Sequence, residues 1–152
     1  MSKNEKKFVA KFKRIYGGGH LNGKLRYVAD GEGDVVEIST DESLRHDEWL
    51  VLIEVDSYTS TKPAVGQYVL LNKLCTHDPS NTLVLVIHYS KGFSADRTMK
   101  NLKFVGPLLI RQPALAYQAF THKSFFQFCR SHPDVSSLVK ALVTLATGKA
   151  KA

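Results

Sequence analysis

The chain has 152 residues, of which 43% are hydrophobic and 23% are charged, a composition typical of one globular domain large enough to bury a core. No apolar run approaches the ~20 residues that span a bilayer, and no apolar signal segment follows the first lysines. We therefore expect an intracellular, cytoplasmic protein without a signal peptide or transmembrane segment. Its two cysteines are too few for a disulfide framework.

The net charge of +7 is segregated along the chain. Residues 1–29 hold eight Lys or Arg and one acid, residues 30–56 hold one Arg and ten acids, and residues 57–152 hold twelve and three. A basic excess of this kind favours a polyanionic partner, either nucleic acid or an anionic membrane surface. Two alternatives stay open: the acidic block of one copy binds the basic segment of another, or the charges only provide solubility.

The first sixteen residues predict an amphipathic helix. Phe8, Phe12 and Ile15 fall on one face and the cations on the opposite face. Such a helix can enter a membrane interface, follow phosphates, or pack its apolar face on the protein's own sheet. The three glycines at 17–19 end the helix, so we predict a basic arm over residues 1–19 with a glycine hinge. The glycine run lacks the spacing of a phosphate-binding loop.

Short apolar runs predict buried strands at 49–53, 68–71 and 83–87. Within the first of these strands, alternate residues from Trp49 onward are expected to share one face. The connections are about as long as a parallel crossover needs, but they lack a helical pattern, so we expect antiparallel pairing.

The flanking segments complete the predicted fold. Segments 24–29 and 35–39 predict a hairpin, whose turn at 30–34 lacks the glycine and glutamate positions of a calcium loop. We predict a loop or a single helical turn at 41–47, and a last strand pair at 102–105 and 108–110 or one strand bent at Gly106 and Pro107. Helices are predicted at 114–130 and 135–148. The fold class is therefore α+β: an antiparallel β-rich core, sandwich or open barrel, over residues 20–148, closed by two C-terminal helices and followed by a basic tail at 149–152.

Two constellations are candidates for chemistry. Two cysteines and two histidines supply a zinc ligand set: Cys75, His77, Cys129 and His132. Their spacings are not those of zinc knuckles, and whether the four residues meet at a metal is left open. Histidines near strand ends or acids are candidates for acid–base work: His46, His88 and His122. No catalytic motif accompanies them, so we predict no enzyme, no metal and no cofactor. The alternative is a small enzyme or ligand-binding domain with a histidine-containing pocket between the sheet and the C-terminal helices.

A β-core with a basic arm resembles the layout of small coat or matrix proteins of viruses. The resemblance implies a non-catalytic homo-oligomer that binds nucleic acid without sequence specificity, or an anionic membrane, through its basic arm. The expected binding residues are Lys3, Lys6, Lys7, Phe8, Lys11, Phe12, Lys13, Arg14, Lys24 and Arg26.

Overall fold

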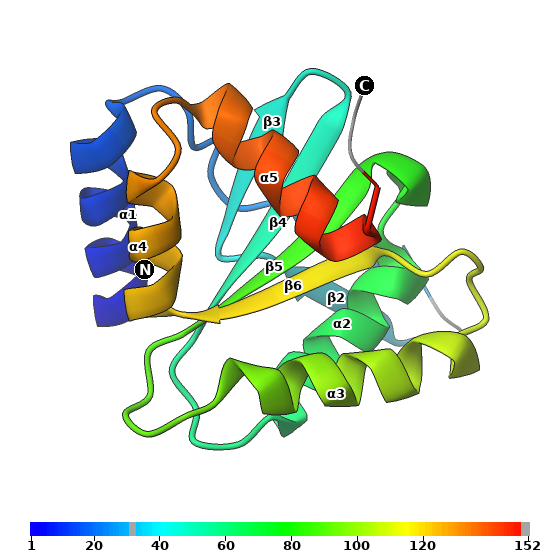
Figure 1. The fold of residues 1–152 in the computed structure, drawn as a ribbon. Coiled ribbons are helices and arrows are strands. Elements are labelled where there is room, and N and C mark those ends of the chain that lie inside the picture. Colours follow the sequence, from blue (N-terminus) through cyan, green and yellow to red (C-terminus); the bar gives the residue numbers. More distant parts are fainter. Residues whose placement is uncertain (31–32, 150–152) are drawn as a thin grey trace.

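The computed structural model describes residues 1–30 and 33–149 and shows a four-stranded sheet with helices on both faces (Figure 1). The α-helices are α1 (Lys3–Tyr16), α2 (Lys62–Leu74), α3 (Ala95–Val105), α4 (His122–Arg130) and α5 (Val135–Thr147). The strands are β1 (Arg26–Asp30), β2 (Val35–Ser39), β3 (Glu42–His46), β4 (Trp49–Asp56), β5 (Thr82–His88) and β6 (Ala116–Thr121). Short 3-10 turns lie at η1 (Pro79–Asn81) and η2 (Gly106–Leu108). The predicted α+β class is confirmed.

The central sheet is mixed, with strand order β3-β4-β5-β6. Strand β3 pairs antiparallel with β4, whereas β4–β5 and β5–β6 are parallel. The predicted antiparallel sandwich or barrel is therefore not confirmed. The predicted hairpin is present as the separate pair β1–β2; Gly31 and Glu32 of its predicted turn lie outside the described residues, as do 150–152 of the predicted tail.

The expectation of antiparallel pairing fails at the second apolar run, which is part of helix α2 and not a strand. Tyr68 and Leu71 are fully buried while Leu70 faces solvent, a spacing that fits a helix with one buried face. Pro63 occupies the first turn, where its missing N–H costs nothing. This helix is the crossover that parallel pairing of β4 and β5 requires.

Three other segments differ from expectation. The predicted loop at 41–47 contains strand β3, the predicted strands at 102–110 are helix α3 and η2, and strand β6 precedes α4 within the predicted helix at 114–130. Strand β6 is mostly half-buried at the edge of the sheet, so it lacks the continuous apolar run of a central strand. The final helix is confirmed as α5, with Asp134 capping its start and Gly148 its end.

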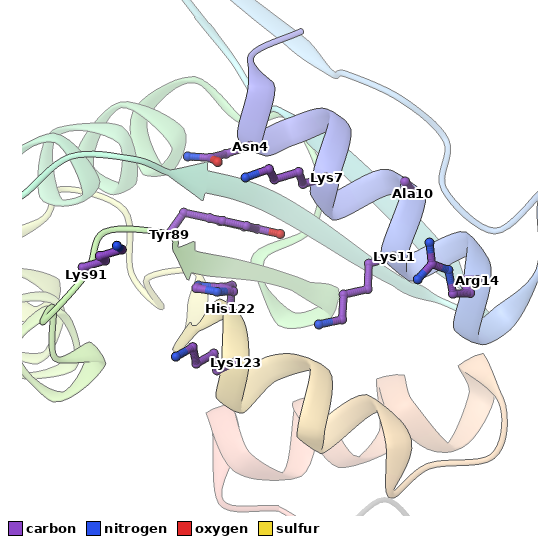
Figure 2. A pocket seen from close by; sticks show the side chains of 9 residues that line it. All are labelled: Asn4, Lys7, Ala10, Lys11, Arg14, Tyr89, Lys91, His122 and Lys123. Atoms are coloured by element: carbon purple, nitrogen blue, oxygen red, sulfur yellow. The ribbon is translucent and has the colours of Figure 1, made fainter.

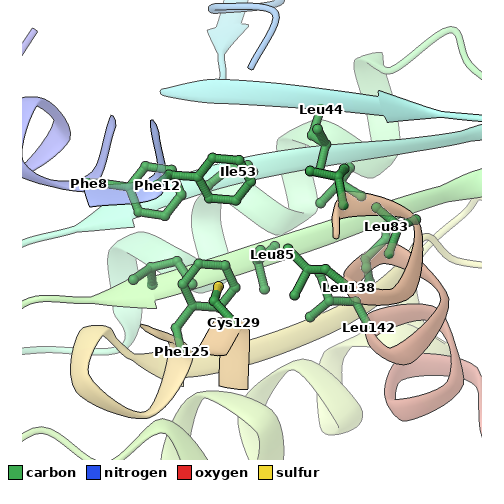
Figure 3. Packing of buried hydrophobic residues seen from close by; sticks show 14 of the residues in the cluster. Phe8, Phe12, Leu44, Ile53, Leu83, Leu85, Phe125, Cys129, Leu138 and Leu142 are labelled. Carbon is green, nitrogen blue, oxygen red and sulfur yellow. The ribbon is translucent and has the colours of Figure 1, made fainter. Parts of the chain in front are cut away.

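The sheet separates two hydrophobic cores. Alternate β4 residues face opposite cores, as predicted: Val51 and Ile53 pack toward α1, α4 and α5 (Figure 3), and Leu52 packs toward α2 and α3. Cys129 belongs to the first core and Cys75 to the second, so the four cysteines and histidines whose meeting the sequence left open do not come together. Among the residues described, no three His, Cys, Asp or Glu side chains are grouped to hold a metal.

Helix α1 is part of the first core. Phe8 and Phe12 are 0% and 1% exposed, and the Phe8 ring lies 5.9 Å from Phe125 and 5.8 Å from Phe126, between centroids. Packing on the protein's own sheet is thus the alternative that the structure adopts, and the expected role of Phe8 and Phe12 in partner binding is wrong because neither ring reaches the surface. Across residues 1–30 and 33–149, no helix combines the length and apolarity needed to cross a bilayer.

We expect Phe12→Ala to lower the free energy of unfolding by about 3–5 kcal/mol, because it removes a fully buried ring and leaves a cavity. The matched control is Phe104→Ala, since Phe104 is 76% exposed, and its effect should stay within about 0.5 kcal/mol. Urea unfolding followed by circular dichroism measures both. Equal effects of the two substitutions would show that α1 does not belong to the cooperative core.

Candidate functional site

Acidic side chains gather at the carboxyl end of β4, in a cavity of about 270 Å³ that we call the carboxylate pocket. Its polar lining comes from separate elements: Glu5 from α1, Asp41 from the β2–β3 connection, Glu54 and Asp56 from β4, and Gln67 from α2. In parallel α/β sheets the carboxyl ends of strands are the usual place for ligands, since the connecting loops diverge there.

Glu54 is the most unusual side chain of this pocket. It is only 5% exposed, and its Oε2 accepts a long hydrogen bond of 3.4 Å from Gln67 Nε2. Its Oε1 is buried without a hydrogen-bond partner. Burial, followed by the negative charge of Asp41, raises the pKa of Glu54 to about 9. A buried carboxyl oxygen without a donor is costly to fold, so this group needs a proton or a cation.

Asp41 and Glu5 surround the same cavity. Burial raises the pKa of Asp41 to about 6, although the hydrogen bond from Val55 N to its Oδ2 lowers that pKa. Burial alone would raise the pKa of Glu5, but hydrogen bonds with Ser2 and the charge of Lys24 lower it. Lys24 Nζ lies 3.4 Å from Glu5 Oε2 and 3.8 Å from Asp41 Oδ1. One ammonium group therefore pairs with two carboxyl groups of the pocket.

Asp56 takes part in a buried chain of hydrogen bonds. Its Oδ2 lies 2.6 Å from His88 Nδ1, and its Oδ1 accepts from Tyr58 N. His88 Nε2 lies 2.8 Å from the Thr98 hydroxyl on α3. This chain fixes the end of β4 against β5 and α3, whereas Glu54 Oε1 has no hydrogen-bond partner.

A second concave surface, which we call the cationic groove, lies on the other side of α1. It encloses about 540 Å³ (Figure 2), and its lining residues are Asn4, Lys7, Ala10, Lys11, Arg14, Tyr89, Lys91, His122 and Lys123. No acid lines it. Asn4 connects the two surfaces, because its Nδ2 donates a 2.8 Å hydrogen bond to the Oγ of Ser57, which lines the carboxylate pocket.

The predicted binding residues lie on different surfaces of the structure. The groove lining contains Lys7, Lys11 and Arg14. Lys3, Lys6 and Lys13 are exposed on α1 but do not line it. Lys24 pairs with Glu5 and Asp41, which line the carboxylate pocket, and Arg26 pairs with Glu37 on the neighbouring strand.

The three candidate histidines do not converge. His88 is buried, His122 lies in the groove, and His46 stands at the opposite end of the sheet, at the β3–β4 turn. The alternative of a histidine-containing pocket needs only one of them and stays a prediction, with His122 as the histidine that lines a groove.

Glu5, Asp41 and Glu54 were missed as a group. Two signals pointed to them: acids at the end of an otherwise apolar strand, and a crossover helix that would make this end a carboxyl edge. The second signal was lost when residues 68–71 were interpreted as a strand, because antiparallel pairing does not gather strand ends of one kind.

No family model and no curated protein matches this chain. Among solved structures it is similar to the small subunit, R.BspD6I2, of the heterodimeric restriction endonuclease R.BspD6I. The TM-score is 0.54 at 12% identity, over 95% of this chain and 78% of that one. At this identity the likeness concerns the fold alone. It contradicts the predicted viral coat or matrix protein, since the fold is similar to that of a restriction endonuclease subunit and α1 is packed into the core.

The protonated state of Glu54 predicts a pH-dependent stability. Between the ordinary pKa of 4.5 and the folded pKa of about 9, the folded protein holds a proton that the unfolded chain releases. The free energy of unfolding should therefore fall as pH rises through this window, by up to about 1.4 kcal/mol per pH unit. Urea unfolding in EDTA across the window measures the slope.

Glu54→Gln should flatten this dependence, because an amide keeps the shape and cannot ionise. The matched control is Glu37→Gln on the exposed surface of β2, which should retain the wild-type slope. A wild-type stability that is constant or rises across the window, or a slope unchanged in Glu54→Gln, would contradict the assignment.

Proposed function

We propose that this protein is a metal-dependent nuclease that hydrolyses phosphodiester bonds at the carboxylate pocket. The observation that carries the proposal is the buried, unpaired Oε1 of Glu54, which lines a pocket shared with Asp41 and Glu5 beside a cationic groove. The similar solved structure is a subunit of a restriction endonuclease, which supports the same reaction class.

The carboxylate pocket fits a magnesium ion. Magnesium prefers oxygen ligands and commonly takes one or two carboxylates, with water and substrate phosphate as its other ligands. Glu54 and Asp41 would supply these carboxylates, and a cation would replace the proton on Glu54 and offset the burial and the repulsion from Asp41 that raise its pKa. A metal bound there supplies Lewis acidity toward the phosphoryl oxygen and a more acidic water.

The surrounding side chains have separate tasks. Gln67 orients Glu54 through its bond to Oε2, and the Val55 N–H holds Asp41 Oδ2 in place. The Lys24 ammonium group, between Glu5 and Asp41, would stabilise the negative charge that develops on the phosphoryl oxygens.

We expect cleavage of DNA that requires magnesium or manganese and stops with EDTA. Asp41→Asn and Glu54→Gln should each lower the rate by about 100-fold or more, since metal-based charge stabilisation contributes several kcal/mol. The matched control is Asp96→Asn, an exposed acid in the first turn of α3, which should cleave like the wild type. Electrophoresis of end-labelled DNA measures the rate.

A second candidate is a non-catalytic nucleic-acid-binding subunit. It is favoured by two observations: Lys24 already neutralises part of the pocket, and among the described residues no three acidic, imidazole or thiol groups are arranged around a common metal. DNA binding without cleavage under any divalent cation would support this candidate and contradict the nuclease. The predicted homo-oligomer stays a prediction, which light scattering tests.

A further inference from the structure

Helix α1 presents one row of side chains to the cationic groove. Asn4, Lys7, Lys11 and Arg14 recur at three- and four-residue spacing and share one helix face, while Lys91 and Lys123 face them from β5–α3 and α4 (Figure 2). Among the described residues none of these cations forms a salt bridge. Lys11 has a ring as its partner, with its Nζ 4.6 Å from the Phe126 ring centroid. Five positive charges thus line one groove, and within the described part of the chain none of them is paired with an acid.

An aromatic pair stands inside this row of cations. Tyr89 and His122 are stacked, with ring centroids 4.5 Å apart and an interplanar angle of 10°. Figure 2 shows the Tyr89 ring between the α1 side chains and His122. His122 Nδ1 lies 3.3 Å from the carbonyl oxygen of His88, which holds the lower ring in position. Tyr89 is half-buried, so part of its ring remains accessible from the groove.

We infer that the cationic groove binds a single-stranded segment of nucleic acid, with phosphates on the lysines and arginine and one unpaired base on the Tyr89–His122 stack. The chemistry of this arrangement is that of single-strand binding, in which a positive groove follows the backbone and aromatic rings stack on bases. Bases of a duplex are already stacked and paired, so a duplex could use the charges but not the rings.

The groove adjoins the carboxylate pocket through Asn4 and Ser57. A strand seated in the groove would therefore lead toward Glu54, and the substrate of the proposed nuclease would carry an unpaired stretch next to the bond that is cut. This last step rests on the proposed function. Binding in the groove does not, because it requires no metal and no cleavage.

Binding is tested by fluorescence anisotropy in EDTA, where no hydrolysis occurs, with a labelled single strand and a blunt duplex of equal length. The wild type should bind the single strand more tightly. Each phosphate contact contributes about 0.7 to the slope of log affinity against log salt. Lys7→Ala combined with Lys123→Ala should therefore lower the slope by about 1.4.

The matched control is Lys6→Ala combined with Lys13→Ala, which removes the same charge from exposed positions outside the groove and should leave the slope nearly unchanged. Equal loss in both double variants would overturn the groove assignment, because it would show a general charge effect.

The stack is tested with Tyr89→Leu, which keeps apolar volume and removes the aromatic face. Affinity for the single strand should fall about 5- to 150-fold, the range measured for one stacked base, with little change for the duplex. Tyr89→Phe keeps the ring and should bind like the wild type. Thermal unfolding by circular dichroism verifies that each variant is folded.

Three outcomes overturn the inference: no single-strand binding, equal affinity for both nucleic acids, or a folded Tyr89→Leu variant with unchanged affinity. Single-strand binding with the predicted variant effects, but without cleavage when magnesium is added, leaves the groove assignment standing and contradicts the nuclease. Cleavage of a blunt duplex that does not depend on Tyr89 would support the nuclease and contradict the groove assignment.

Discussion

The parallel pairing of β4 with β5 is the constraint on which the rest of the structure depends. Both strands are buried along their whole length on both faces, so helices must cover each side of the sheet. The pairing also requires a crossover, which α2 provides, and it brings two carboxyl ends together. Glu54, Asp56 and His88 lie at this shared edge because Asp56 and His88 are direct partners in the parallel register.

Burial at this edge explains why the pocket is poised for a ligand. A carboxyl group buried without a donor destabilises the fold, and the neighbouring carboxyl group of Asp41 increases this cost. Such local violations are expected at functional sites, where the remaining structure compensates for them. The adjacent chain of Asp56, His88 and Thr98 shows the contrast, since the polar atoms that it brings together are paired.

Helix α1 links the core to both concave surfaces. Its apolar face inserts Phe8 and Phe12 into the core, its first turn brings Glu5 to the carboxylate pocket, and a third face lines the cationic groove. An acidic pocket and a basic groove thus lie on two sides of one helix. In the proposed function the groove binds the phosphates of a polyanion and the pocket holds a cation at the reacting phosphate. The burial of the two phenylalanines fixes both surfaces relative to the sheet.

Local patterns in the sequence determined four elements: the amphipathic helix at the N-terminus, the hairpin, the two-faced strand from Trp49, and the capped helix at the C-terminus. Each depends on periodicity, turns or caps, which act over a few neighbouring residues. Local patterns did not determine the state of residues 68–71, since an apolar run of four fits a buried helix turn as well as a strand. Tertiary packing alone decided that α2 crosses over and that β4 and β5 run parallel. It also decided that Glu5, Asp41 and Glu54, which are distant in sequence, share one cavity. The packing of α1 on the core brings Glu5 there, and the antiparallel pairing of β3 with β4 brings Asp41 beside Glu54.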